Sequence, residues 1–421
     1  MNFRMTASLA STAGALAMLA ATAAFADDTP PAPAAAPAAA APAAPATPAA
    51  PTPAPYPAMS ASLAGNAPPL TFDLGILGSK VTIGGVLSGF AQTQDNPVFN
   101  GSTGKRDQTS TVDLSNAQLF INKSDGVVQY FIEVGAYSLP NLSSLPYSPA
   151  SKTPSNSYGN LPQGFIKLVP NANFSIEVGA LPTLIGAEYT FTFENLNVER
   201  GLLWGVEPAV SRGVQGNATF GPLAVSVAWT DGFYSNRYNT VSGLATWTIN
   251  SANTLAADFQ TPTNTSNVTT SITSPVLDNE TIYNLMYTNT TGPWTFNPYL
   301  QYTSTPANTF LHYGTETSWG AALLVNYAFD AKSKLAGFSL PFRIEYVSTH
   351  GTETAAPNLL YGPGSNAWSF TLTPTYQYKQ YFIRAEASYV SASKVNGGDG
   401  YGVTGDQTSQ VRGIIETGVL F

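Results

Sequence analysis

The sequence contains no cysteine and little charge. Its 421 residues include two His, 17 Lys+Arg and 25 Asp+Glu, so charged residues make up only 10% of the chain. An ordinary soluble domain carries about a quarter charged residues. The lack of cysteine excludes disulfides, thiolate metal sites and thiol nucleophiles. The net charge of −8 argues against electrostatic binding of nucleic acid, so we expect no nucleic-acid partner.

Long apolar runs are also missing beyond the N-terminal segment. No run there approaches the about 20 residues that a membrane-spanning helix requires. Aromatic residues are nevertheless frequent, at 12%, and the chain contains 36 Gly. This combination argues against a helical membrane protein and leaves strands as the way in which such a chain would cross a bilayer.

The N-terminus has the features of a secretory signal peptide, residues 1–26. Arg4 supplies the basic end, residues 7–20 an apolar core, and residues 24–26 a small-x-small cleavage site. A membrane anchor is the alternative, but the apolar stretch is short, rich in alanine and followed at once by two aspartates. Residues 27–60 are almost entirely Ala, Pro and Thr, which predicts a disordered periplasmic linker. That linker is either a spacer that contacts the cell wall or a tolerated low-complexity tail.

From about Val81 onward, apolar and polar side chains alternate in segments of about ten residues. In residues 368–376, one face is apolar and the other carries hydroxyl groups. Soluble sandwiches show the same alternation, so it does not by itself establish a membrane protein. We expect sixteen strands in residues 61–421, with fourteen or eighteen left open, near 81–93, 109–122, 127–138, 162–169, 174–181, 209–220, 223–233, 240–250, 254–261, 279–288, 293–303, 317–329, 338–348, 366–377, 381–391 and 408–421.

The connections between these strands alternate between long and short. Residues 94–108, 139–161 and 182–208 are long, whereas residues 123–126 and 221–222 are short. Two junctions fit poorly, since 234–239 is short for an outer loop and 330–337 is long for a turn. The alternation predicts an all-β fold, a transmembrane antiparallel up-and-down β-barrel with short periplasmic turns and long external loops.

Charged residues within the strands fall on one face only. In the last strand Arg412 and Glu416 oppose Val411, Ile415 and Val419. Because Arg or Lys facing lipid at mid-membrane costs about 2–4 kcal/mol, the charged face should be the interior. A bore that holds so many charges is predicted to be wet. The side chains expected to face it are Glu133, Lys167, Glu177, Arg212, Arg343, Glu345, Arg384, Glu386, Arg412 and Glu416.

Two features of the sequence carry a resemblance to known proteins. The alternating final strand, residues 411–421, ends in Phe421 and resembles the assembly signal of bacterial outer-membrane proteins. Residues 179–188 and 200–204 are similar to the OmpL-like β-barrel porin family. The resemblance implies passive transport of small hydrophilic solutes and ions across the bacterial outer membrane. The resemblance also implies that a homotrimer is an option. We expect outer-membrane lipid to surround the barrel.

The third long loop, residues 182–208, is the candidate site. In porins a third external loop often folds inward, so by resemblance we expect this one to narrow the pore. Facing cations such as Lys167, Arg212 and Arg412 would then create a field across the bore that favours polar solutes. The alternative is a solvated external loop with no role in the pore. The candidate constriction residues are Glu188, Glu194, Glu199, Arg200 and Glu207.

Two other classes of function stay open. One is a barrel enzyme such as a lipid hydrolase, which needs a nucleophile and a base. The only histidines are His312 and His350, both expected at external loops, and no Gly-x-Ser-x-Gly motif occurs. The other is a structural or adhesive barrel without an open pore. We expect no catalytic residues, no cofactor and no metal, since the glycine-rich residues 396–401 lack the repeated acidic ligands of a calcium loop.

Overall fold

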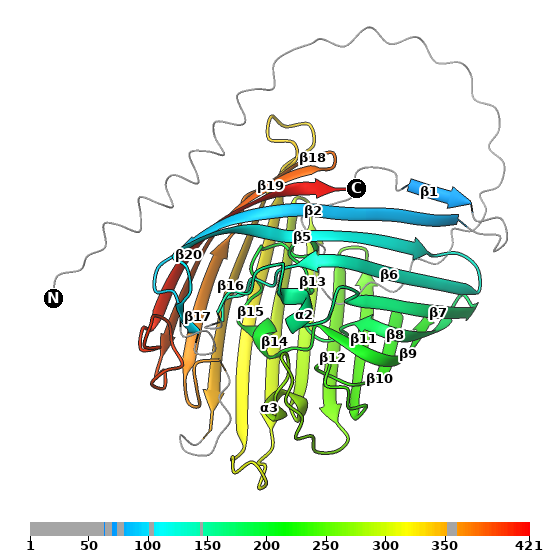
Figure 1. Ribbon diagram of the computed structural model, residues 1–421. Helices are drawn as coiled ribbons and strands as arrows, with labels where there is room; N and C mark the ends of the chain where they lie inside the picture. The colour runs from blue at the N-terminus through cyan, green and yellow to red at the C-terminus, as the bar shows by residue number, and fades with distance from the viewer. Residues whose placement is uncertain (1–62, 64–69, 74–79, 101–104, 144–145, 352–359) are drawn as a thin grey trace, which may run out of the picture. The chain divides into compact units, whose positions relative to one another are not determined.

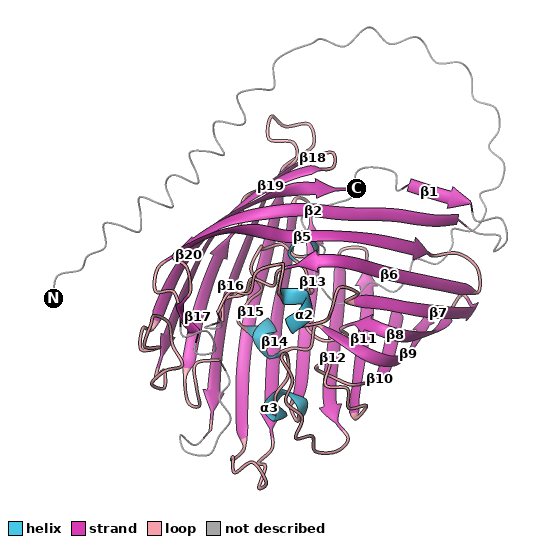
Figure 2. Ribbon diagram, in the orientation of Figure 1, coloured by secondary structure: helices cyan, strands magenta, loops and turns pink. Residues whose placement is uncertain are grey.

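The computed structural model describes residues 63, 70–73, 80–100, 105–143, 146–351 and 360–421. The expected signal peptide and the whole of the expected linker lie outside the described residues, as does residue 61, at which the barrel segment was expected to begin. Backbone hydrogen bonds join 18 strands into one antiparallel sheet. Figure 2 shows little helix in the described part of the chain, where two four-residue α-helices, α2 (Thr153–Asn156) and α3 (Pro275–Asp278), interrupt the long connections.

The sheet closes on itself as a sixteen-strand barrel, which confirms the expected fold class and strand number. β2 pairs with β5 on one side and with β20 on the other, so the barrel has no open edge between these strands. The sixteen barrel strands, with β17 and β18 counted as one, are β2 (Lys80–Gln94), β5 (Ser110–Lys123), β6 (Val128–Tyr137), β7 (Gln163–Asn171), β8 (Phe174–Pro182), β9 (Val210–Phe220), β10 (Leu223–Thr230), β11 (Thr240–Asn250), β12 (Asn253–Pro262), β13 (Thr281–Thr291), β14 (Trp294–Thr305), β15 (Glu316–Ala328), β16 (Phe338–His350), β17 (Asn366–Leu372) with β18 (Thr375–Tyr378), β19 (Tyr381–Ser393) and β20 (Ser409–Leu420).

Three strands and one interruption depart from the expected pattern. β1 (Leu70–Asp73) pairs with the start of β2, where β2 extends past the end of β20. β3 (Phe99–Asn100) and β4 (Lys105–Arg106) form a small hairpin in the first long loop. The expected strand 366–377 is divided into β17 and β18, because Pro374 between them has no N–H with which to continue the ladder.

The connections sort by length as expected. Short turns such as residues 124–127, 172–173 and 221–222 join the strands at one end, which we call the short-turn end. Long connections gather at the other end, which we call the long-loop end (Figure 1). β10 ends earlier than expected, at Thr230, so the following loop spans residues 231–239 and is longer than the sequence suggested. Residues 329–337 remain a long connection at the short-turn end.

The distribution of side chains is inverted relative to a soluble protein. On β13 the outward Leu285 is 47% exposed, whereas the inward Asn284 beside it is 5% exposed. β20 repeats the pattern, with inward Arg412 and Glu416 buried. Among the described residues, many large apolar side chains are exposed on the strands while most strand charges are buried. This inversion suits an exterior in contact with hydrocarbon, because lipid cannot solvate charge.

Aromatic rings gather near the ends of the barrel strands. At the short-turn end the Trp294 ring stacks on Phe296 at 5.6 Å between centroids and packs edge-on against Tyr327 at 4.6 Å. Nearer the long-loop end Trp319 packs on Tyr302 at 4.5 Å. Such rings suit the headgroup regions on either side of the hydrocarbon.

We predict that a charge on the outer face is costly. Leu285→Arg should lower the free energy of unfolding by about 2–4 kcal/mol in phospholipid vesicles, because Leu285 lies at the middle of β13 and faces outward. Urea titration in vesicles measures the change. Tyr238→Arg, in the loop 231–239, is the matched control and should change it by less than about 1 kcal/mol. Equal effects of the two variants would show that β13 does not face lipid.

Candidate functional site

The third long connection, residues 183–209, lies inside the barrel, and we call it the inner loop. Its residues Val198, Glu199, Arg200 and Leu202 have exposed fractions of 0%. Its polar groups bond to inward side chains of β5, β12, β14, β16, β19 and β20, and to Thr373 between β17 and β18. The alternative of a solvated external loop therefore does not describe these residues.

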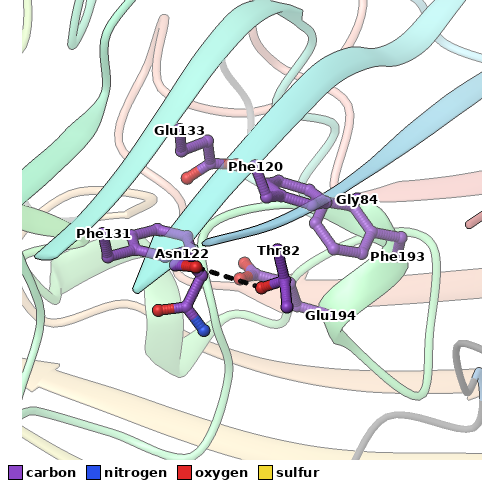
Figure 3. A pocket seen from close by; sticks show the side chains of 8 residues that line it. All are labelled: Thr82, Gly84, Phe120, Asn122, Phe131, Glu133, Phe193 and Glu194. Atoms are coloured by element: carbon purple, nitrogen blue, oxygen red, sulfur yellow. Dashed lines mark hydrogen bonds between the residues drawn. The ribbon is translucent and has the colours of Figure 1, made fainter. Parts of the chain in front are cut away.

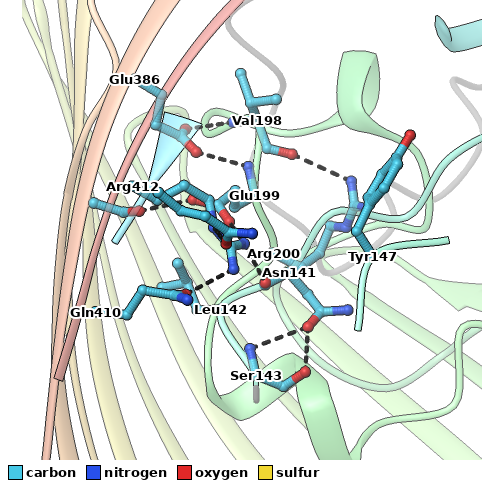
Figure 4. A network of polar contacts seen from close by, with 12 residues as sticks. Asn141, Leu142, Ser143, Tyr147, Val198, Glu199, Arg200, Glu386, Gln410 and Arg412 are labelled. Atoms are coloured by element: carbon cyan, nitrogen blue, oxygen red, sulfur yellow. Dashed lines mark hydrogen bonds and ion pairs between the residues drawn. The ribbon is translucent and has the colours of Figure 1, made fainter. Parts of the chain in front are cut away.

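Two carboxylates of the barrel wall accept hydrogen bonds from the backbone of the inner loop. Glu386 on β19 accepts from the Val198 N–H at 2.6 Å and from the Glu199 N–H at 2.9 Å (Figure 4). Glu345 on β16 accepts from the N–H groups of Leu202 at 3.0 Å and Leu203 at 3.3 Å. A buried loop without regular structure must find partners for its backbone N–H groups, and the wall supplies them.

Arginines of the wall hold the carbonyl oxygens of the inner loop. Arg384 donates to the carbonyl oxygens of Asn195 at 3.0 Å and Thr192 at 2.9 Å, while its Nε bonds to Glu416 at 2.8 Å. Arg343 donates to the carbonyl oxygen of Glu199 at 2.8 Å. The wall charges therefore contact the loop directly and are not separated from it by water.

Side chains of the inner loop complete the network. Glu188 forms an ion pair with Arg343. Glu199 forms one with Arg412 (Figure 4). Glu199 also accepts a hydrogen bond from Ser388 on β19 at 2.7 Å. Buried ion pairs of this kind contribute chiefly when both partners are present, because either charge left alone is costly.

A second anchor joins the predicted Glu207 to the neighbouring wall, whose partner residues the sequence analysis did not identify. Glu207 accepts hydrogen bonds from the Tyr299 hydroxyl and, at 2.7 Å, from Gln301, both on β14. Asp258 on β12 accepts from the Gly186 N–H at 3.1 Å. Asp258 and Gln301 alternate with outward apolar residues, and that alternation was the available signal for an inward position.

Arg200 is the one candidate cation in the inner loop, and it is fully buried. Its Nη1 donates to the Val198 carbonyl oxygen at 3.4 Å, and its guanidinium lies 5.5 Å from the centre of the Trp204 ring. Burial lowers the pKa of Arg200 to about 10, although carboxylates led by Glu188 and Glu416 act in the opposite direction. Arg200 therefore places its charge among several carboxylates without a direct ion pair in the described part of the chain.

Burial also acts on the acids of the inner loop. It raises the pKa of Glu188, where Arg343 opposes the effect, and it raises the pKa of Glu207 further, where the Tyr299 hydroxyl opposes it. Burial raises the pKa of Glu194 to about 7, against a hydrogen bond from the Phe191 N–H and the charge of Arg200. Glu194 therefore changes its charge near neutral pH.

The other charges predicted to face the bore lie on β6, β7, β8 and β9. Lys167 on β7 pairs with Glu177 on β8 at 2.9 Å, and Glu133 on β6 accepts a hydrogen bond from Gln118 at 2.8 Å. Arg212 is a correction. It lies at the outer end of β9 on the face that carries the exposed Val214, and it pairs with Asp231 at 2.7 Å.

The remaining predicted positions lie at the two ends of the barrel. The Phe421 N–H donates to the Gly85 carbonyl oxygen at 3.0 Å, so the C-terminus is fixed to β2. His312 lies in the connection between β14 and β15, and His350 ends β16.

In the part of the chain that the structure describes, no group of three or more His, Cys, Asp and Glu side chains could hold a metal ion. None of the described helices is long and apolar enough to cross a membrane.

A closed sixteen-strand barrel with charges inside, apolar residues outside and a loop folded inward defines a porin-like outer-membrane protein. Residues 80–421 match the model of the family described as "putative beta-barrel porin-2, OmpL-like", and the chain belongs to that family. It is thus a porin of the bacterial outer membrane in the general sense of that family. No curated protein matches the sequence.

Solved outer-membrane proteins share the fold at low sequence identity. The anion-selective porin from Comamonas acidovorans is 10% identical over 82% of this chain and 100% of its own, with a TM-score of 0.54. Outer-membrane expressed OmpT of Vibrio cholerae is 12% identical over 84% of this chain and 100% of its own, with a TM-score of 0.53. At these identities the likeness establishes the fold alone.

We predict that Arg384 keeps the inner loop in place. Arg384→Met leaves the buried Glu416 without its cation and removes the guanidinium donors to two loop carbonyl oxygens, which should cost about 3–5 kcal/mol and release the loop. Trypsin should then cut after Arg200, the one Lys or Arg in residues 183–209, and mass spectrometry detects that cut. Lys167→Met is the control, because its pair with Glu177 does not touch the loop. Resistance of Arg200 to trypsin in the Arg384 variant would contradict this role.

Proposed function

We propose that the protein is a passive channel for small hydrophilic solutes and ions, in which the inner loop forms the constriction. The observation that carries the proposal is the position of residues 183–209, which join the β8–β9 side of the bore to β14, β16, β19 and β20 through polar contacts. A loop held across the bore limits what can pass through it.

The chemistry of the bore supports a hydrated path. Several inward polar atoms are buried without a protein partner, among them Thr246 Oγ1, Asn297 Oδ1 and Gln92 Oε1. Leaving a buried polar atom unpaired costs about 1–3 kcal/mol, and water usually satisfies such atoms. A dry bore would leave these groups uncompensated, so water in the bore is the simplest partner for them.

The balance of charge favours cations. The inner loop and the wall around it carry ten carboxylates against five cations. The carboxylates are Glu133, Glu177, Glu188, Glu194, Glu199, Glu207, Asp258, Glu345, Glu386 and Glu416, and the cations are Lys167, Arg200, Arg343, Arg384 and Arg412. Rings of excess carboxylates favour cation passage, so we propose a cation preference.

A barrel without an open pore is the second candidate, and one observation favours it. A cluster of buried apolar residues joins the inner loop to the wall at the long-loop end, and it includes Leu203, Ala322, Val347, Tyr361 and Tyr401. The Tyr361 and Tyr401 hydroxyls bond to each other at 2.5 Å, and the Tyr401 hydroxyl donates to the Leu142 carbonyl oxygen at 2.8 Å. If the barrel is a channel, solutes must pass beside these contacts. If the contacts fill the bore, the barrel is closed.

Three further proposals concern the ends of the chain and its assembly. We propose that residues 27–60 are a periplasmic spacer, that Phe421 is the residue recognised during insertion, and that the protein assembles as a homotrimer. The last rests on the porin family and on the trimer form of OmpT from Vibrio cholerae, which has a similar fold. Native mass spectrometry of detergent-solubilised protein gives the subunit number, and a monomer would exclude the trimer.

Planar bilayers test the proposed function directly. Protein lacking residues 1–26 should produce discrete conductance steps, with a reversal potential in a salt gradient of the sign expected for cation preference. Glu199→Gln should reduce that preference, because it removes an inner-loop charge next to Arg412. Asp125→Asn, at an exposed turn, is the control and should leave it unchanged. Absence of conductance steps would overturn the channel in favour of the closed barrel.

The pKa of Glu194 predicts a dependence on pH. Burial holds that pKa at about 7, and the groups facing Glu194 are Glu133 from β6 and Arg200 from the inner loop. Because deprotonation adds a negative charge to the bore, the cation preference should rise between about pH 6 and about pH 8. Reversal potentials across that range measure it. Glu194→Gln should flatten the profile, and an unchanged profile in this variant would assign the pH dependence to another group.

A further inference from the structure

A cavity of about 290 Å³ lies on the short-turn side of the inner loop, next to the 3-10 turn Thr192–Glu194. β2, β5 and β6 form its wall, and the loop closes it from the other side (Figure 3). Its size is close to the lower end of the range for small-molecule sites, which is about 300–1,000 Å³. The ion-pair network of the inner loop does not include the residues that line it.

Three phenyl rings line the cavity. Phe120 lies 6.3 Å from Phe131 with an interplanar angle of 17°, and 5.5 Å from Phe193 with an angle of 37°. Phe120 and Phe131 point into the bore from β5 and β6, where most inward residues are polar, and Phe193 comes from the inner loop. Three rings gathered at an inward position that could be polar indicate a surface selected for an apolar or cationic ligand.

Two carboxylates share the same cavity, those of Glu133 and Glu194 (Figure 3). Glu133 is 1% exposed and accepts a hydrogen bond from neutral Gln118, while Glu194 accepts one from the Phe191 N–H. Neither forms an ion pair with a Lys, Arg or His among the described residues. By contrast, Glu177, Glu188, Glu199 and Glu416 each have a cation within ion-pair distance.

The lining selects between kinds of cation. A calcium or magnesium ion requires about six or more oxygen ligands at close range. Here the other polar residues are Thr82, whose hydroxyl already donates to the Asn122 carbonyl oxygen at 3.1 Å, and Asn122 itself. Phenyl rings do not ligate such metals, but their faces attract ammonium groups, most strongly where water is excluded.

We propose that this cavity binds organic cations that join an ammonium group to an apolar body, with Glu133 and Glu194 compensating the charge and Phe120, Phe131 and Phe193 holding the body. The proposal rests on the channel function, of which it names a solute class. Its place on the short-turn side makes it a site in the inner vestibule, reached from the periplasmic side of the constriction. A bound cation would also supply the positive charge that the two carboxylates lack.

Calorimetry on the detergent-solubilised full chain tests binding independently of conductance. Benzyltrimethylammonium should bind measurably, and benzyl alcohol, which has the ring without the charge, should bind at least about tenfold more weakly. Glu133→Gln and Glu194→Gln should each weaken the ammonium ligand by about tenfold, and Phe193→Leu by about three- to fivefold. Asp330→Asn, which removes an exposed carboxylate from a turn at the same end, is the control and should have no effect.

The outcomes separate this proposal from the channel function. Conductance steps without ammonium binding would overturn the proposal and leave the channel intact, while binding without conductance would do the reverse. If Mg²⁺ alone bound and displaced the ammonium ligand, or if the glutamate variants bound like the wild type, the assignment to organic cations would be wrong. In bilayers the ligand should reduce conductance at lower concentration when it is added from the short-turn side.

Discussion

Hydrocarbon solvates neither backbone hydrogen-bonding groups nor charge, and the whole structure depends on this constraint. It requires the strands to close, which β2 achieves by pairing with both β5 and β20. It also turns the strand charges inward, so Arg343, Arg384 and Glu386 are collected in the bore. There they meet a loop whose backbone N–H and carbonyl groups need partners just as the charges do.

The inner loop and the wall therefore stabilise each other. Without the loop, buried arginines and carboxylates would depend on water alone, and without the wall, residues 183–209 would lose the partners that replace regular secondary structure. The side chains that form these contacts also set the electrostatics of the bore, where carboxyl groups outnumber cationic groups. In the proposed channel, ion selectivity would depend on these side chains and not on the barrel fold. A structural neighbour described as anion-selective shares the fold at 10% identity, and its preference does not transfer with the fold.

The barrel strands could be predicted from the sequence, because contact with lipid requires apolar and polar side chains to alternate along each strand. Long-range features could not. Pro374 divides the expected strand 366–377, and Arg212 lies on the outer face at the rim, where headgroups tolerate charge and Asp231 pairs with it. The resemblance indicated that residues 182–208 fold inward. Their partners on β12, β14 and β19 lie far along the chain, and no periodic pattern encodes such pairs.

Cysteine cross-linking tests most directly whether the inner loop is held against the wall. The chain has no native cysteine, and Asn116 on β5 donates to the Thr192 hydroxyl of the loop at 2.5 Å. Asn116→Cys combined with Thr192→Cys should cross-link on oxidation in vesicles, whereas Asn116→Cys with Tyr238→Cys, in an outer loop, should not. If the thiol at position 192 stayed free and reacted with an impermeant maleimide as fast as that at position 238, the loop would be external and the account would be wrong.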